Sequence, residues 1–452
     1  MNYTKDAFGD DFHWGVSVAA YQIEGAHDAD GKGMSIWDKF SYKGKRIEDG
    51  SDATTACDFY HKYHEDIELM KNLNIDNFRF SISWPRILPN GTGEINEAGI
   101  TYYNKLIDKC LENNITPWVT LYHWDLPEAL EKKGGWTHRS IIYYFKEYVE
   151  ICTKRFGDRV KNWIVMNEPF SFTALGYMFG YYAPGKFGVN NYLPSVHHAT
   201  LCQAEGARII RNNVPHANIG TAISCSHVTP ASDKPKHIAA AKRVDSLFNR
   251  MYIEPLLGMG YPFGDFPFLE RIEKYIHPYD MELMKYDFDF IGLQNYYSLV
   301  AYDAPIIPYI NAFVKPFHKL NRPLTANGWE VYPEGIYNIL KQYSNYPIKK
   351  IIVTENGAAF HDKVVDGRVQ DTGRLEYLKG YLGQVLKAKN DGVNIGGYFV
   401  WTLMDNFEWK AGFKSRFGLV HVDFKKQTRT IKDSGLWYKA FLGNAPSNHV
   451  IW

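Results

Sequence analysis

Residues 350–357 of the chain read K-I-I-V-T-E-N-G. The apolar run at 351–353 predicts a short strand that is buried on both faces, as strands of parallel sheets are. The run ends at Thr354, so Glu355 stands at the carboxyl end of the predicted strand. Gly357 follows two residues later, and we expect the backbone to turn there. The stretch therefore predicts a buried parallel strand that delivers a carboxylate at its end.

A second stretch has the same order of residue types. The apolar run W-I-V-M at 163–166 leads directly into Asn167, Glu168 and Pro169. The carboxyl ends of parallel strands meet at one end of a barrel, so we expect Glu168 and Glu355 to face each other. Two facing carboxylates predict acid–base or nucleophilic chemistry at that end.

Strand-like apolar runs alternate with amphipathic segments along the whole chain. We predict eight strands, at residues 12–20, 77–83, 116–122, 162–166, 218–225, 288–293, 350–354 and 395–401. Helical periodicity predicts helices between them, at 60–72, 101–113, 140–156, 193–213, 333–342 and 374–391. This alternation predicts an α/β fold, a single-domain (β/α)8 TIM barrel with elaborated βα loops that spans residues 1–452. The clearest loop, at 302–328, is rich in proline and aromatic residues, and we expect it to form a wall of the site entrance.

The charge balance excludes several classes of function. The chain has 51 Lys and Arg against 50 Asp and Glu, so its net charge of +1 gives no basis for binding nucleic acid or an anionic membrane. No apolar run is long enough for a transmembrane helix. Five scattered cysteines without C-x-x-C spacing predict reduced core thiols, and the first residues lack the apolar core of a signal peptide. We therefore expect a cytoplasmic protein.

Patterns that would hold a cofactor are missing from the sequence. No G-x-G-x-x-G or Walker pattern occurs, so we expect no nucleotide or other cofactor. His61 and His64 have H-x-x-H spacing, and His197 and His198 are adjacent. Without neighbouring thiols or carboxylates in a ligand pattern, we interpret these histidines as surface or packing residues and expect no metal.

Polar and aromatic side chains follow nearly every predicted strand. The candidates, in chain order, are Gln22, Arg79, His123, Trp124, Asn167, Glu168, Tyr296, Tyr297, Glu355, Trp401, Glu408 and Trp409. Amide, imidazole and carboxylate groups hydrogen-bond sugar hydroxyls, and aromatic rings pack on apolar sugar faces. Two carboxylates suit the hydrolysis of a glycosidic bond, where one protonates the leaving oxygen while the other attacks or activates water. Arg79 would keep the attacking carboxylate ionised.

Five sequence blocks lie at these strand ends. They read F-H-W-G-V-S-V-A-A-Y-Q-I-E-G-A at 12–26, F-R-F-S-I-S-W-P-R-I at 78–87, N-E-P at 167–169, V-T-E-N-G at 353–357 and W-T-L-M-D-N-F-E-W at 401–409. Together and in this order they resemble the signature blocks of the family 1 glycoside hydrolases, the β-glucosidase family. The resemblance covers essentially the whole chain. It implies a (β/α)8 barrel and retaining hydrolysis of non-reducing terminal β-D-glucosyl residues through a covalent glycosyl-enzyme, with activity on β-fucosides and β-galactosides also expected.

The resemblance also implies a role for each matched residue. Glu355 would be the nucleophile and Glu168 the general acid and then the base, while Asn167 would bind the sugar 2-hydroxyl. Arg79 and Tyr296 would contact the nucleophile. The other expected sugar contacts are Gln22, His123, Trp124, Trp401, Glu408 and Trp409, with Trp329 as an aglycone platform. The expected partners are small β-glucosides such as cellobiose or aryl and alkyl glucosides, and formation of a homo-oligomer is left open.

One departure from the family pattern lies after the sixth predicted strand. The family usually reads G-x-N-Y-Y, whereas Gly292 is followed here by L-Q-N-Y-Y. Alignment without a gap puts Gln294 in the asparagine place and Tyr296 in the place of the catalytic tyrosine; a shift by one would select Asn295 and Tyr297. Since alternate strand residues face opposite sides, only one tyrosine can point inward, and we favour Tyr296.

Two rival functions follow from other members of this family. A 6-phospho-β-glucosidase would need a cationic or hydroxyl-bearing cluster after the eighth strand, where this chain has Glu408 and Trp409. A catalytically silent sugar-binding homologue would typically lack one of the two glutamates, and both are present here. The sequence therefore favours an active β-glucosidase over either rival.

Overall fold

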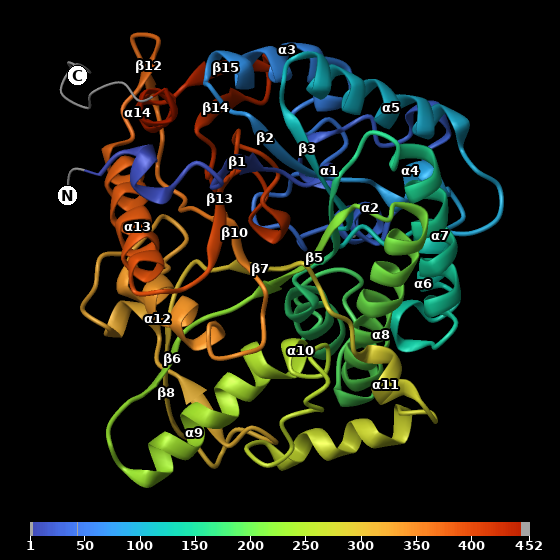
Figure 1. Ribbon diagram of the computed structural model, residues 1–452, viewed down its shortest axis with the longest axis vertical. Helices are drawn as coiled ribbons and strands as arrows, with labels where there is room; N and C mark the ends of the chain where they lie inside the picture. Colours follow the sequence, from blue (N-terminus) through green and yellow to red (C-terminus); the bar gives the residue numbers. More distant parts are fainter. Residues whose placement is uncertain (1–2, 43, 444–452) are drawn as a thin grey trace.

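Eight parallel strands close into a barrel at the centre of the molecule (Figure 1). The computed structural model describes residues 3–42 and 44–443. The barrel strands are β1 (His13–Ser17), β2 (Asn77–Ser81), β3 (Thr116–Tyr122), β4 (Asn162–Asn167), β5 (Asn218–Ser224), β7 (Phe290–Gln294), β10 (Ile351–Asn356) and β13 (Ile395–Trp401). Each strand pairs with the next in chain order, and β13 closes on β1 with Ser17 opposite Trp401. The predicted (β/α)8 barrel is confirmed.

Among the predicted strands, the first has the largest boundary error. The prediction extends it to residue 20, but β1 ends at Ser17 and helix α1 (Ala20–Ile23) begins directly afterwards. The backbone N–H of Val18 donates to the carbonyl of Arg79, and that of Ala20 to the hydroxyl of Ser81. The run V-S-V-A-A is apolar because the whole turn is buried, and burial of a turn has the same composition as burial of a strand.

Helices pack around the outside of the barrel (Figure 1). The longer helices are α3 (Phe59–Asn72), α5 (Glu97–Glu112), α7 (Ile141–Phe156), α8 (Val189–Asn213), α9 (Pro235–Asp245), α12 (Glu334–Tyr343), α13 (Thr372–Asn390) and α14 (Asp433–Leu442). Six match predicted helices, whereas α9 and α14 have no predicted counterpart. Helix α9 buries only Ala240, Ala241 and Val244, so it lacks a wide apolar stripe.

Shorter elements occupy the loops. They are α2 (Ile36–Tyr42), α4 (Trp84–Ile87), α6 (Glu128–Glu131), α10 (Met251–Ile253), α11 (Asp280–Met284), and the hairpins of β11 (Val364–Val365) with β12 (Arg368–Val369) and β14 (Val420–Asp423) with β15 (Thr428–Ile431). Strands β6 (Val228–Pro230), β8 (Leu299–Asp303) and β9 (Ala312–Val314) form a separate three-stranded sheet, which lies beside α9 outside the barrel (Figure 1). The prediction of an irregular loop at 302–328 is therefore wrong in part, because β9 and the end of β8 pair within it.

Apolar side chains fill the middle of the barrel. Trp118 of β3 packs edge-on against Phe290 of β7 and Phe399 of β13, with ring centroids 5.6 and 5.1 Å apart. Strand β3 neighbours neither β7 nor β13, so these contacts cross the barrel interior. The fully buried cluster is completed by Ile164, Ala222 and Ile352. This layer supports the polar side chains that lie at the carboxyl ends of the strands.

Candidate active site

The two glutamates follow irregularities in their strands. The register of β4 against β5 shifts between Ile164 and Asn167, and the register of β10 against β7 shifts between Val353 and Glu355. Glu168 has a backbone φ of +43°, a left-handed conformation that non-glycine residues rarely adopt. Irregularities of this kind redirect side chains and are common next to active sites. They aim both carboxyl groups away from a regular strand position.

Glu355 is a buried carboxylate with a donor on each oxygen. Arg79 Nη1 donates to Glu355 Oε1 at 2.5 Å, and the Tyr296 hydroxyl donates to Glu355 Oε2 at 2.7 Å. Burial raises the pKa of Glu355 above its ordinary value, while the charge of Arg79 and the hydrogen bonds from both donors oppose this rise. Charge-assisted hydrogen bonds of this kind stabilise the ionised form. Arg79 is itself fully buried, so the attraction between the two charges is little screened.

Glu168 has a different environment. Its carboxyl group is buried, and the hydroxyl of Ser171 donates to Oε2 at 2.7 Å. Burial, and then the negative charge of Glu355, raise the pKa of Glu168 to about 8. At neutral pH this carboxyl group is mostly protonated and can donate a proton. The two glutamates are thus suited to opposite roles.

Arg79, Asn167 and His123 form one hydrogen-bonded chain across the barrel. Arg79 Nη2 donates to Asn167 Oδ1, and Asn167 Nδ2 lies 3.1 Å from His123 Nε2. Because Asn167 Nδ2 is a donor, His123 Nε2 accepts and the imidazole proton lies on Nδ1. Burial and the charge of Arg79 lower the pKa of His123 well below its usual range, so the ring is neutral. Within the described residues His123 Nδ1 has no hydrogen-bond partner, which leaves it available to a hydroxyl oxygen.

Gln22 and Glu408 form a second polar group, between the β1 exit and the loop after β13. Gln22 Nε2 donates to Glu408 Oε2 at 3.2 Å, to Asn406 Oδ1 at 3.0 Å and to the carbonyl of Phe407 at 2.9 Å. Gln22 Oε1 is buried and has no partner in the part of the chain that the structure describes. Burial, and then the charge of Glu355, raise the pKa of Glu408 to about 8. Both side chains can exchange hydrogen bonds with a bound polyol.

Aromatic rings link these two polar groups. The His123 ring stacks on Trp401 and on Trp409, each with a centroid separation of 5.8 Å. Trp124 lies 4.4 Å from Trp409, and its indole N–H donates to the backbone carbonyl of Asn167. Because that N–H is used within the protein, Trp124 supports Trp409 and Asn167 in this structure. The structure thus brings together the sugar-contact candidates from the first, third, fourth and eighth strands.

The sequence alternative between two tyrosines corresponds to two different surroundings. Tyr296 holds Glu355, as described above, and its ring lies 5.6 Å from Trp329. Tyr297 packs between Trp329 and Phe317, with centroids 5.3 and 5.1 Å away. The structure therefore places the Tyr296 hydroxyl on the Glu355 carboxylate and packs Tyr297 between the rings of Trp329 and Phe317.

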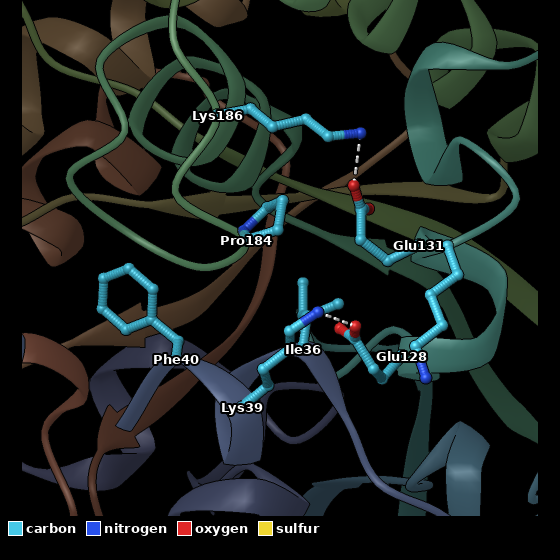
Figure 2. Close-up of a pocket in the computed structure, with 8 residues that line it drawn as sticks. Ile36, Lys39, Phe40, Glu128, Glu131, Pro184 and Lys186 are labelled. Atoms are coloured by element: carbon cyan, nitrogen blue, oxygen red, sulfur yellow. Dashed lines mark hydrogen bonds and ion pairs between the residues drawn. The ribbon is translucent and has the colours of Figure 1, made fainter. Parts of the chain in front are cut away.

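Ion pairs fasten three loops beside this site (Figure 2). Helix α6 carries Glu128 and Glu131, and each forms an ion pair. Glu128 pairs with Lys39 of α2, and Glu131 pairs at 2.5 Å with Lys186 of the loop after β4. The pairs border a cavity of about 200 Å³. On the same helix as Lys39, Trp37 packs 4.7 Å from Trp409. The pairs thus fix the helix that carries Trp37, which supports the aromatic wall.

The sequence predicts no role for three residues of this site. Gln294 contacts Asn167, Ser171 contacts Glu168, and Asn406 contacts Gln22. The only sequence signal for Gln294 was its departure from the usual family asparagine. Ser171 lies on a π-helical turn, Ser171–Met178, that no simple periodicity predicts.

Comparison with known proteins places the chain in a family. The family model of Glycosyl hydrolase family 1 matches residues 4–446. The chain belongs to glycosyl hydrolase family 1. This membership and the barrel confirm the resemblance drawn from the sequence blocks, and they make the chain a glycoside hydrolase by family.

Several full-length relatives of this family 1 chain are named β-glucosidases. Beta-glucosidase A of Thermotoga maritima is 44% identical over 98% of this chain and 99% of its own length, and Beta-glucosidase A of Acetivibrio thermocellus is 43% identical over 98% and 99%. A solved family 1 β-glucosidase from Thermotoga maritima superposes with a TM-score of 0.94 at 41% identity, covering 98% of this chain and 99% of that one. Another solved structure of the Thermotoga maritima family 1 enzyme, with a cyclophellitol-analogue transition-state mimic, has a TM-score of 0.94 at 42% identity and covers 97% and 98%.

Neither a metal-binding cluster nor a membrane-spanning helix occurs within the described part of the chain. In residues 3–42 and 44–443, no group of three or more His, Cys, Asp or Glu side chains is arranged to hold a metal ion. Over the same residues, no helix combines the length and the apolar character that crossing a membrane requires.

Proposed function

We propose that this family 1 chain is a retaining β-glucosidase, with Glu355 as the nucleophile and Glu168 as the general acid and base. Two full-length relatives, at 43% and 44% identity, are named Beta-glucosidase A. The observation that carries the assignment of roles is the contrast between the two buried carboxyl groups. Arg79 and Tyr296 donate to Glu355 and oppose the rise that burial causes in its pKa, whereas Glu168 has no such cationic donor among the described residues, and burial and the neighbouring charge raise its pKa to about 8.

In the first step the glycosidic bond is exchanged for an ester. An ionised Glu355 oxygen attacks the anomeric carbon, the bond from that carbon to the glycosidic oxygen breaks, and Glu168 gives its proton to the leaving oxygen. Arg79 and Tyr296 aim the attacking carboxylate through hydrogen bonds that are present before substrate binds.

In the second step water cleaves the ester. Once Glu355 is esterified its charge is gone, and this charge is one of the two causes that raise the pKa of Glu168. Glu168 therefore ionises more readily and takes a proton from the attacking water. The water oxygen bonds to the anomeric carbon as the Glu355 carboxylate leaves. Two displacements at one carbon return the original configuration, which defines a retaining enzyme.

We propose small β-glucosides, such as cellobiose and aryl or alkyl glucosides, as substrates, with β-fucosides and β-galactosides as further ones. Gln22, His123 and Glu408 would bind the glycone hydroxyls, and Trp401 and Trp409 would pack on its face. A 6-phosphoglycoside fits less well, because a Glu408 carboxyl group offers a phosphate dianion no opposite charge, whether that carboxyl is neutral or ionised.

A cytoplasmic location is the second part of the proposal. All five cysteines are buried free thiols, which suits a reducing compartment. The oligomeric state, which the sequence leaves open, can be measured by light scattering of the purified chain.

The test of the proposed activity compares an aryl β-D-glucoside with its 6-phosphate. We expect a high kcat/KM on the plain glucoside, little turnover of the phosphate, and loss of nearly all activity in Glu355→Ala. A higher kcat/KM on the phosphate would assign a phosphoglycosidase. Sugar binding by a folded protein without turnover of either compound would assign a silent binding protein.

A further inference from the structure

Gln294 is a buried amide that the roles proposed above do not use. It is the last residue of β7, is fully buried, and pairs along the backbone with Ser224 of β5 and Glu355 of β10. Its side-chain Nε2 donates to Asn167 Oδ1 at 2.7 Å. Asn167 lies on β4, which is separated from β7 by β5, so this contact can form only across the barrel interior. The Gln294 side chain therefore points into the site.

The donor end of Gln294 serves the site in two ways. It donates to Asn167, and the same amide opposes the rise that burial causes in the pKa of the neighbouring Glu355. Asn167 Oδ1 thus receives hydrogen bonds from both Gln294 and Arg79, and these fix the orientation of the Asn167 amide. With its oxygen held in this way, Asn167 presents Nδ2 on its other side, towards His123.

The acceptor end of Gln294 is unoccupied. Gln294 Oε1 is buried and has no hydrogen-bond partner in residues 3–42 and 44–443. Buried carbonyl oxygens nearly always accept a hydrogen bond, so such an oxygen indicates that a donor is brought to it. Gln22 Oε1 and His123 Nδ1 are unpartnered in the same sense, and both belong to the candidate sugar site. The donor for Gln294 Oε1 would therefore be a hydroxyl of the bound sugar.

We infer that Gln294 binds the 2-hydroxyl of the glycone through Oε1 and positions Asn167 and Glu355 through Nε2. This inference rests on the proposed function, in which Glu355 lies at the anomeric carbon and Asn167 at the 2-hydroxyl. Gln294 contacts both of them, so its free oxygen lies on the same side of the sugar, next to carbon 2. An asparagine, the residue usual in the family, is one methylene shorter and cannot span the same distances from the same backbone position.

The test compares Gln294→Met, which keeps the length and removes both polar ends, with the wild-type enzyme on two substrates. These are an aryl β-D-glucoside and the corresponding 2-deoxy-β-D-glucoside, which lacks only the 2-hydroxyl. We expect Gln294→Met to lower kcat/KM about tenfold or more on the glucoside and much less on the 2-deoxy compound, because a buried hydrogen bond is lost only with the first. We also expect the acidic limb of the pH profile of kcat/KM to move to higher pH, because Glu355 loses a neighbouring amide that lowers its pKa.

Equal losses on both substrates, with an unmoved acidic limb, would overturn the inference and leave Gln294 as a packing residue. If Gln294→Met does not fold, Gln294→Asn keeps an amide and is expected to change the same two quantities in the same direction; wild-type values for both would overturn the inference. Wild-type turnover of the plain glucoside, measured first, separates this result from failure of the proposed function, which would abolish turnover in the parent enzyme.

Discussion

Removing the charge of Glu355 is expected to lower the pKa of Glu168. The pKa of Glu168 is raised to about 8 by its burial and then by the charge of Glu355. Glu355→Gln removes that charge, keeps the shape of the side chain and leaves the burial of Glu168 unchanged. Only the electrostatic part of the shift is then lost, and Glu168 ionises at lower pH than in the wild-type enzyme. The same change should follow esterification of Glu355 during turnover.

The magnitude follows from the burial of the pair and from Coulomb's law. The carboxyl groups of a retaining pair lie roughly 5–5.5 Å apart, and an effective dielectric constant of about 20 suits buried sites, so the repulsion is about 3 kcal/mol. One pKa unit corresponds to about 1.4 kcal/mol, so Glu355→Gln is expected to lower the pKa of Glu168 by about 2. Burial, the larger cause, should still hold it above the ordinary value for a glutamate.

The assay is a carboxyl-carbon NMR titration of the 13C-glutamate-labelled protein, with Glu168→Gln used to assign the Glu168 signal. Glu94→Gln, at an exposed glutamate, is the matched control and should leave the titration of Glu168 unchanged. In the active enzyme the ionisation of Glu168 is expected to set the basic limb of the pH profile. The value of kcat/KM should fall as pH rises through about 8, because Glu168 loses the proton that it must donate. An unchanged Glu168 titration in Glu355→Gln would refute the electrostatic coupling.

Three further predictions concern the surroundings of the nucleophile. Arg79→Met should raise the pH of the acidic limb of kcat/KM and, since it breaks a buried ion pair, lower the free energy of unfolding by about 3–5 kcal/mol in denaturant titrations; an unchanged unfolding midpoint would contradict this. Tyr296→Phe should lower kcat at least tenfold, whereas the matched Tyr297→Phe should lower it less than threefold, and equal effects would argue against the inward position of Tyr296. Gly357→Ala should lower the melting temperature, because a Cβ there would lie 1.8 Å from the backbone oxygen of Trp401. If the variant melts at the wild-type temperature, the backbone moves aside without cost and the prediction is contradicted.

The barrel was predictable because most of its strands are short, buried runs of mainly apolar residues. Buried parallel strands such as β3 and β13 are continuous apolar runs, and both were predicted with the bounds that the structure has. The first strand was predicted too long because the buried turn after Ser17 is as apolar as the strand. Likewise α9 was missed because its buried face consists of two alanines and one valine. An apolar stretch of sequence indicates that its residues are buried, but burial alone does not distinguish a strand from a turn, and a helix with few buried side chains gives no such signal.

The site was predictable from residues at strand ends, but the contacts among them were not. The sequence places Gln294 in the asparagine position of a family block, yet nothing in it shows that the amide reaches Asn167 across the barrel. The position of Gly357 after a strand predicts a turn, whereas the structure requires glycine there because the backbone of Trp401 approaches closely. Such contacts depend on the distance between strands that are far apart in the chain, and no local pattern encodes that distance.

The central claim is that Glu355 forms a covalent bond to the sugar, and trapping that bond tests it most directly. A 2-deoxy-2-fluoro-β-glucoside with a good leaving group slows both steps but slows hydrolysis of the ester more, so the intermediate accumulates. We predict one added fluoroglucosyl group per chain by intact mass spectrometry, located by peptide mapping on Glu355, with loss of activity in proportion to labelling. Labelling of another residue, or turnover of the glucoside with release of the α-anomer of glucose, would contradict the account.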